Sequence, residues 1–199
     1  MLKPAAAPER TAPPAPDGDG ALMVLVAAGD AIAFRKLVDR HAAMVHALAW
    51  RMLGPADAED VVQECFTRLW VHAKGWAPAG GGLGGWLRRV ATNLCLDRLR
   101  KPQMVSDDAV ADRRDEAPPA DAWLDAVRRE SAVADAVRAL PDRQRAAIVL
   151  TYYEGVPNAE AAAILGLGVK AVESLLVRAR QALIRTLARQ GLIELGDPV

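Results

Sequence analysis

The segment Asn158–Arg180 combines small, apolar and basic residues at the spacing of two short helices joined by a glycine turn. Two helices cross closely when a small residue lies at the crossing, a glycine permits the turn between them and an apolar residue of the second helix packs against the first. Ala162, Gly166 and Val172 meet these three requirements. The pattern favours a helix-turn-helix that enters the major groove of DNA, although an ordinary helical hairpin with a solvated basic face would share it.

The second helix of this segment supplies the predicted DNA contacts. Its outer face would meet base edges in the groove, and its arginines would also meet phosphates. The predicted contacts are Lys170, Glu173, Ser174, Val177, Arg178 and Arg180.

A second group of candidate contacts falls in a helix expected from about Trp86 to Lys101. Leucine, valine and alanine side chains form one stripe of this helix, and polar side chains lie toward another side. The polar set is Arg89, Thr92, Asn93, Asp97, Arg100 and Lys101. The preceding residues 74–85 hold Pro78 and six glycines, which predict an exposed loop. A basic helix beside such a loop suits capture of an unstacked base, but taken alone the segment fits a charged amphipathic helix better.

Composition and periodicity predict the elements that position these residues. Apolar residues make up 52% of the chain and few are aromatic, which favours an all-α protein. Three- and four-residue spacing predicts one helix over residues 34–53, a second from an N-cap at Asp57, and more helices from about residue 123 onward. We expect two small helical domains, 21–101 and 126–192, joined by a flexible acidic linker over 102–125, with tails at 1–20 and 193–199.

The zero net charge of the 199-residue chain hides a segregation of charge. Residues 21–101 carry a net charge of +4, residues 102–125 carry −5 and residues 126–192 carry +4. The two basic blocks are compatible with a polyanionic partner, although charges of this size are also common on solvated helices.

Other function classes find little support in the sequence. His41, His46 and His72 have no ligand or triad spacing, and no glycine-rich phosphate loop follows a strand, so we predict neither an enzyme nor a metal or cofactor site. Cys65 and Cys95 have no paired spacing, which fits a reduced cytoplasmic setting. No signal peptide or run of about 20 apolar residues is evident, so membrane insertion is not expected.

Taken in order, the motifs resemble those of extracytoplasmic-function sigma factors of the bacterial sigma-70 family. Residues 57–64 (DAEDVVQE), 86–93 (WLRRVATN) and 97–100 (DRLR) are similar to the promoter-melting domain of that family. Residues 140–145 (LPDRQR), 160–162 (EAA), 172–174 (VES) and 178–180 (RAR) are similar to its second DNA-binding domain. The chain departs from the family pattern at Leu175, where many members carry an arginine. It also has Leu83 and a run of glycines where the family usually has a bulky aromatic residue just before the Trp-Leu pair.

The resemblance implies three binding surfaces and several partners. The helix from Asp57 would dock on core RNA polymerase through Asp60, Gln63, Glu64 and Arg68. The loop 74–85 and the following helix would open and recognise the minus-ten promoter element, with Arg88, Arg89, Asn93, Asp97, Arg100 and Lys101 as contacts. The helix-turn-helix would recognise the minus-thirty-five element. Family members are commonly held inactive by an anti-sigma factor, so such a partner is expected here.

Two alternatives share parts of this pattern. A sigma-like decoy that sequesters an anti-sigma factor would keep the packed cores but could lose the basic recognition positions, which this chain retains. A simple helix-turn-helix repressor would have no need for the acidic helix that begins near Asp57.

Overall fold

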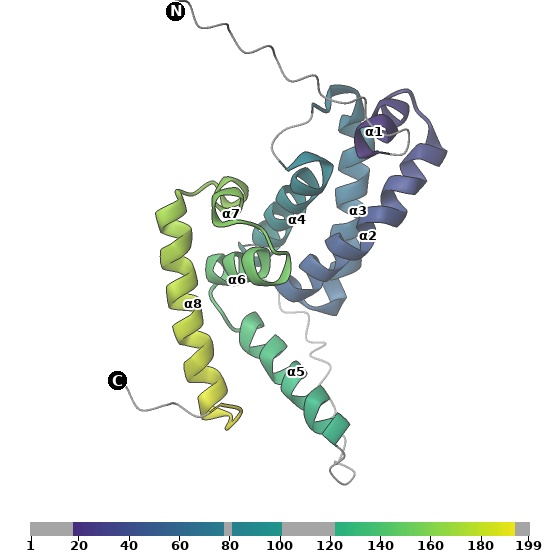
Figure 1. Ribbon diagram of the computed structural model, residues 1–199. Helices are drawn as coiled ribbons and strands as arrows, with labels where there is room; N and C mark the ends of the chain where they lie inside the picture. Colours follow the sequence, from purple (N-terminus) through teal and green to yellow (C-terminus); the bar gives the residue numbers. More distant parts are fainter. Residues whose placement is uncertain (1–17, 78–80, 101–121, 194–199) are drawn as a thin grey trace, which may run out of the picture.

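The computed structural model describes residues 18–77, 81–100 and 122–193, and within these residues every regular element is helical (Figure 1). The predicted all-α class is therefore confirmed. The helices are α1 (Asp19–Ala27), α2 (Ala31–Leu53), α3 (Pro55–His72), α4 (Gly82–Arg100), α5 (Ala122–Arg138), α6 (Asp142–Ile148), α7 (Asn158–Leu165) and α8 (Val169–Arg189), with short helical turns η1 (Ala73–Gly75) and η2 (Val149–Tyr153).

Helices α1 to α4 form the first half of the molecule. Asp30 caps α2 by accepting hydrogen bonds from the backbone N–H groups of Ile32 and Ala33, at 2.8 and 3.0 Å. The predicted apolar stripes of α2 and α3 face each other and α4, and Leu37, Leu48 and Leu69 are almost fully buried there. Burial of these stripes positions α3 and α4, which carry two of the three predicted surfaces.

Helix α1 is an element that the sequence analysis did not predict. Residues 1–20 were expected to be a disordered tail; residues 1–17 lie outside the described residues, but Asp19 and Gly20 belong to α1. Leu22, Met23 and Val26 bury this short helix against α2 and η1. The Asp19 carboxylate also pairs with Arg40 and with Nε2 of His41, the latter at 2.9 Å.

Two helices begin at residues other than those predicted, because other features of the structure stabilise their first turns. Helix α3 begins at Pro55, not after an Asp57 cap: proline suits the first turn, since its missing N–H would be unpaired there in any case. Helix α4 begins at Gly82, inside the predicted loop 74–85, of which residues 78–80 lie outside the described residues. Leu83 is 2% exposed, and its burial offsets the poor helix propensity of the neighbouring glycines.

The second half consists of α5 to α8. Helix α6 continues directly into η2, a wider helical turn that ends before Gly155. Helices α7 and α8 meet at Gly166, whose φ of 63° and ψ of 38° place it in the left-handed region that glycine adopts without steric cost. Ala162 and Val172 are buried at the crossing, so the predicted helix-turn-helix geometry is present.

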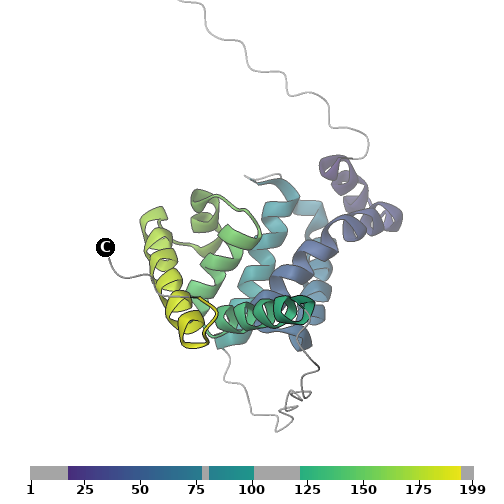
Figure 2. The ribbon, with the colours of Figure 1, turned by 60° about the horizontal axis from the view of Figure 1, so that its bottom comes forward.

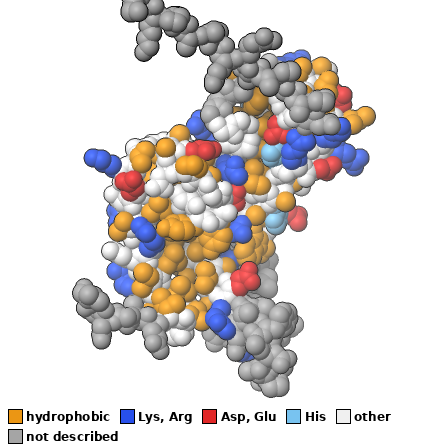
Figure 3. All heavy atoms as spheres, viewed as in Figure 1, with side chains coloured by type: hydrophobic (Ala, Val, Ile, Leu, Met, Phe, Trp, Pro, Cys, Tyr) orange, Lys and Arg blue, Asp and Glu red, His pale blue; other side chains and the backbone are white. Residues whose placement is uncertain are grey.

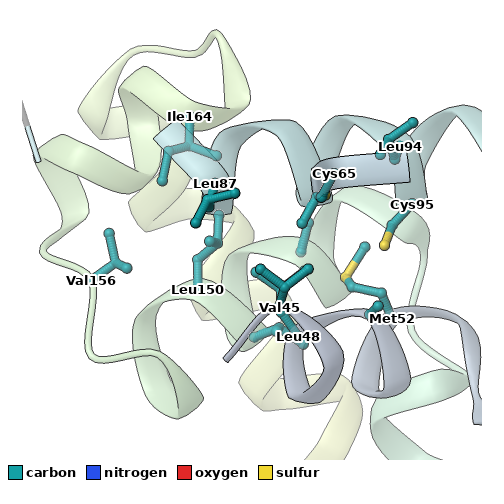
Figure 4. Close-up of a cluster of buried hydrophobic side chains, with 14 of the residues drawn as sticks. Val45, Leu48, Met52, Cys65, Leu87, Leu94, Cys95, Leu150, Val156 and Ile164 are labelled. Carbon is teal, nitrogen blue, oxygen red and sulfur yellow. The ribbon is translucent and has the colours of Figure 1, made fainter. Parts of the chain in front are cut away.

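The two halves pack against each other. Helix α4 contacts α6 and α7, while α2 contacts α5, α6 and η2. Figure 2 shows α5 crossing from α8 to the first half, and Figure 4 shows Leu87 of the first half beside Leu150 of the second. Buried residues of both halves therefore share one apolar cluster. Of the predicted linker 102–125, residues 102–121 lie outside the described residues, whereas 122–125 belong to α5, which begins at Ala122.

Candidate nucleic-acid interface

The exposed face of α4 forms one continuous polar stripe. Arg89, Asn93, Asp97 and Arg100 follow each other at intervals of four, four and three residues, and all are exposed. This spacing places the four side chains on one side of the helix. Arg100 Nη1 lies 3.4 Å from Asp97 Oδ1, an exposed pair that holds the arginine only weakly. Lys101, the last predicted contact on this helix, lies outside the described residues.

Thr92 of the polar set and Arg88, another predicted minus-ten contact, are placed differently from the exposed stripe of α4. Thr92 was grouped with the exposed side chains, but it is 1% exposed, because α4 is packed by α2, α3, α6 and α7 and therefore buries more than one side. Arg88 is partly exposed, and its Nε lies 3.3 Å from Glu154 Oε2, a residue that follows η2 in the second half. Its guanidinium is thus engaged within the molecule.

The Thr92 hydroxyl is buried without a hydrogen-bond partner. A buried polar group without a partner costs about 1–3 kcal/mol in stability, so we expect Thr92→Val to raise the free energy of unfolding by roughly 1 kcal/mol. Urea unfolding followed by circular dichroism would measure the change. Thr92→Ser retains the hydroxyl and serves as the matched control, with no gain expected; a Thr92→Val variant less stable than the wild type would contradict the expectation.

The outer face of α8 presents the predicted major-groove contacts. Lys170, Glu173, Ser174, Val177, Arg178 and Arg180 are all exposed. Three of them donate hydrogen bonds to the helix backbone: Ser174 Oγ to the Lys170 carbonyl at 2.9 Å, Arg178 Nε to the Ser174 carbonyl at 3.2 Å and Arg180 Nε to the Leu176 carbonyl at 3.3 Å. Leu175, the departure from the family pattern, is only 9% exposed and packs into the core.

The predicted polymerase-binding residues lie along the exposed side of α3. Glu64 and Arg68 form an ion pair one helical turn apart, with Oε1 and Nε separated by 2.8 Å, and Asp60 and Gln63 are exposed beside them. Two shallow apolar grooves between α2 and α3, of about 510 and 520 Å³, both include Val62 and Gln63 in their walls.

Aromatic residues beside this face were not predicted as functional. The rings of Phe34 and Trp70 meet edge to face with centroids 5.0 Å apart, and Trp70 is 40% exposed. A tryptophan exposed next to a groove is typical of a protein-binding surface. No sequence signal separated it from the core, because aromatic residues at helical spacing are usually buried.

The contacts that join the two halves were also missed by sequence reasoning. Arg145 donates a hydrogen bond to the Met52 carbonyl at the end of α2. The Arg51 guanidinium lies over the Tyr153 ring, 4.6 Å from its centroid, a cation–π contact. These partners are far apart in sequence, so no local pattern could have indicated them.

An apolar groove of about 610 Å³ opens where α2, α5 and η2 meet. Trp50, Val137 and Tyr153 line its walls, and Arg51 and Arg138 are also among its lining residues. Figure 3 shows hydrophobic side chains gathered on the same side of the molecule, between α5 and α8. A large apolar recess with charged residues around it is suited to binding another protein segment.

The residues that the structure describes form neither a metal-binding cluster nor a reactive thiol site. No group of three or more metal-ligating side chains is present there. Cys65 and Cys95 are free and fully buried, and burial raises the pKa of each thiol to about 12, which keeps both protonated and unreactive near neutral pH. Within the same residues, no helix is long and apolar enough to cross a membrane.

Comparison with known proteins agrees with this layout. The family model for sigma-70 region 2 matches residues 37–104, and the model for sigma-70 region 4 matches residues 130–183. The first match holds the polar face of α4, and the second holds the turn between α7 and α8 together with the predicted contacts on α8.

Curated relatives and solved structures extend the similarity over most of the chain. It is 36% identical to the ECF RNA polymerase sigma factor SigE of Mycolicibacterium smegmatis, over 77% of this chain but only 61% of the relative. It is 33% identical to the ECF RNA polymerase sigma factor SigW of Bacillus subtilis, over 80% of this chain and 91% of that one.

Two solved structures are similar in fold. One is CnrH in complex with the cytosolic domain of CnrY, with a TM-score of 0.62, 32% identity and coverage of 86% of this chain and 97% of that one. The other is the sigma factor RpoE in complex with the anti-sigma factor NepR from Bartonella quintana, with a TM-score of 0.60, 25% identity and coverage of 78% and 96%.

Proposed function

The chain belongs to the extracytoplasmic-function sigma factors of the sigma-70 family, and we propose that it binds core RNA polymerase and directs transcription initiation at specific promoters. The observation that carries this proposal is the presence of two separate polar helix faces, on α4 and on α8, each within one of the two matched family regions. Two such faces on one chain can contact two promoter elements. The protein then acts by binding and positioning rather than by catalysis.

Each predicted surface takes one part of this task. The exposed side of α3 binds polymerase through Asp60, Gln63, Glu64 and Arg68, with the neighbouring apolar grooves adding buried area. The polar stripe of α4, extended by Arg88 and Lys101, binds the minus-ten element. The outer face of α8 binds the minus-thirty-five element. The corresponding domains are 21–101 and 126–192, with 102–125 as the connection between them.

An anti-sigma factor is the proposed regulator. The two solved structures described above are complexes, one with the cytosolic domain of CnrY and one with an anti-sigma factor. The groove beside Trp50 and Val137 supplies an apolar surface for such a partner on this chain. We place the protein in the cytoplasm, where RNA polymerase acts, and we expect release from the regulator to follow an external stress.

In-vitro transcription tests the proposed function. Purified core RNA polymerase and genomic DNA fragments should give promoter-specific transcripts only when the full-length protein is added. Correctly folded protein that binds polymerase yet gives no transcript from any fragment would contradict promoter activity and would favour the decoy that sequesters an anti-sigma factor. Heparin challenge before nucleotide addition distinguishes melted promoter complexes from nonspecific binding.

A further inference from the structure

We propose that Glu154 and Glu160 of the second half form an intramolecular cover over the beginning of α4, which keeps the free protein closed until the two halves separate. The proposal rests on the proposed function only in assigning α4 to promoter binding. The closed arrangement itself follows from contacts between α4 and the segment from η2 to α7.

The first contact is the ion pair between Arg88 and Glu154. Arg88 Nε and Glu154 Oε2 are 3.3 Å apart and 66 residues apart in sequence. The Glu154 side chain is only 7% exposed and that of Arg88 is 25% exposed, so both groups have lost much of their contact with water. Removing one partner of such a pair leaves the other charge poorly solvated, which makes this contact sensitive to substitution.

The second contact places Glu160 against the first turn of α4. A Cβ atom added to Gly81 would lie 2.6 Å from Glu160 Oε1 and 3.1 Å from the Gly85 Cα, so the carboxylate occupies the space beside this glycine. The first backbone N–H groups of a helix have no partner within it, and the helix dipole favours negative charge there. A carboxylate from α7 at the start of α4 therefore has a favourable electrostatic environment.

The two carboxylates lie at the beginning of α4, where Glu154 is paired with Arg88, one of the predicted minus-ten contacts. Glu154 accepts a hydrogen bond from Nε of Arg88 and offsets part of its positive charge, so the paired guanidinium attracts a DNA phosphate less strongly than a free one. DNA binding to α4 and closure of the two halves therefore oppose each other, and each weakens the other by the same factor. Arg89 and Asn93 stay exposed in the closed form, so the cover blocks only part of the predicted DNA-binding face of α4.

Energy transfer between two dyes tests the closed form directly. Ile32 on α2 and Ile184 on α8 are 74% and 45% exposed, so cysteines at these positions can be labelled. The native Cys65 and Cys95 are fully buried and will not compete for the dye.

The charge-swap variants decide whether Glu154 holds the halves together. In the labelled Ile32→Cys/Ile184→Cys protein, Glu154→Arg should shift the population toward lower transfer efficiency, and Arg88→Glu/Glu154→Arg should restore the original distribution. Glu59→Arg makes the same change of charge on an exposed position of α3 and should leave the distribution unchanged. Unchanged transfer in Glu154→Arg, or no recovery in the swapped pair, overturns the proposal.

A DNA-binding assay tests the masking of α4. Glu154→Gln removes the charge with little change in side-chain shape. This variant can therefore still be measured if Glu154→Arg fails to fold. The full-length Glu154→Gln protein should bind a fluorescent single-stranded 20-nucleotide DNA of random sequence about fivefold more tightly than the wild type, measured by anisotropy, because Arg88 becomes available.

The two readouts separate failure of the cover from failure of the proposed function. If Glu154→Gln opens the protein but leaves DNA affinity unchanged, the masking of α4 is overturned. If no variant binds DNA at all while the charge swap still restores closure, promoter binding by α4 is overturned and the contact between the halves stands.

Discussion

Replacing Arg89 and Asn93 together by alanine is expected to reduce promoter-dependent transcription by at least tenfold. Both side chains are exposed on the polar stripe of α4 and lie one turn apart, so they can contact the same short stretch of DNA. Loss of one charged and one neutral hydrogen-bonding group should cost about 2–3 kcal/mol of binding free energy, which corresponds to a factor of roughly 30–150. Multiple-round in-vitro transcription with saturating core RNA polymerase would measure the loss.

The matched control removes similar groups from other surfaces. Arg35→Ala/Gln190→Ala deletes one exposed arginine and one exposed amide outside the three predicted surfaces. This double variant should keep transcription within about twofold of the wild type, since it removes none of the predicted contacts. Equal activity of the Arg89→Ala/Asn93→Ala protein and this control would show that the polar stripe of α4 does not recognise the promoter. Circular dichroism of both variants checks that neither has lost its helices.

Truncating Leu150 to alanine is expected to lower the free energy of unfolding by about 2–5 kcal/mol. Leu150 is 1% exposed and lies in the shared core, with Leu87, Val45 and Leu48 of the first half near it (Figure 4). Its removal would leave a cavity where the halves meet, and surrounding helices can collapse into such a cavity only in part. Urea unfolding monitored at 222 nm would give the change.

Two comparison variants show whether the cost comes from the position between the halves. Leu150→Ile conserves the side-chain volume and should cost less than about 1.5 kcal/mol. Leu69→Ala, buried at 1% exposure within α3 of the first half, should cost a similar amount to Leu150→Ala but leave the distance between the halves unchanged. A Leu150→Ala protein within about 0.5 kcal/mol of the wild type would contradict the shared core.

Local sequence was sufficient for most of the helices and for the outward faces of α4 and α8. Amphipathic spacing identifies which side of a helix is buried, and Gly166 marks the turn of the helix-turn-helix because only a glycine adopts its left-handed conformation at no steric cost. Local propensity does not indicate the helix starts at Pro55 and Gly82, because it favours an N-cap at Asp57 and a loop over the glycine-rich run. At Gly82, the burial of Leu83 by the rest of the fold overrides that propensity.

The amino-acid sequence by itself determined the all-α class and the family, and it predicts the residues of the three binding surfaces. Only the tertiary structure decided that the two halves share a core, that Thr92 is buried and that Arg88 is paired with Glu154. Contacts between the halves join residues far apart in the sequence: 66 positions separate Arg88 from Glu154, and 93 separate Arg145 from Met52. Periodicity reports which side of one helix is apolar, whereas the partner that covers that side is set by how all the helices pack.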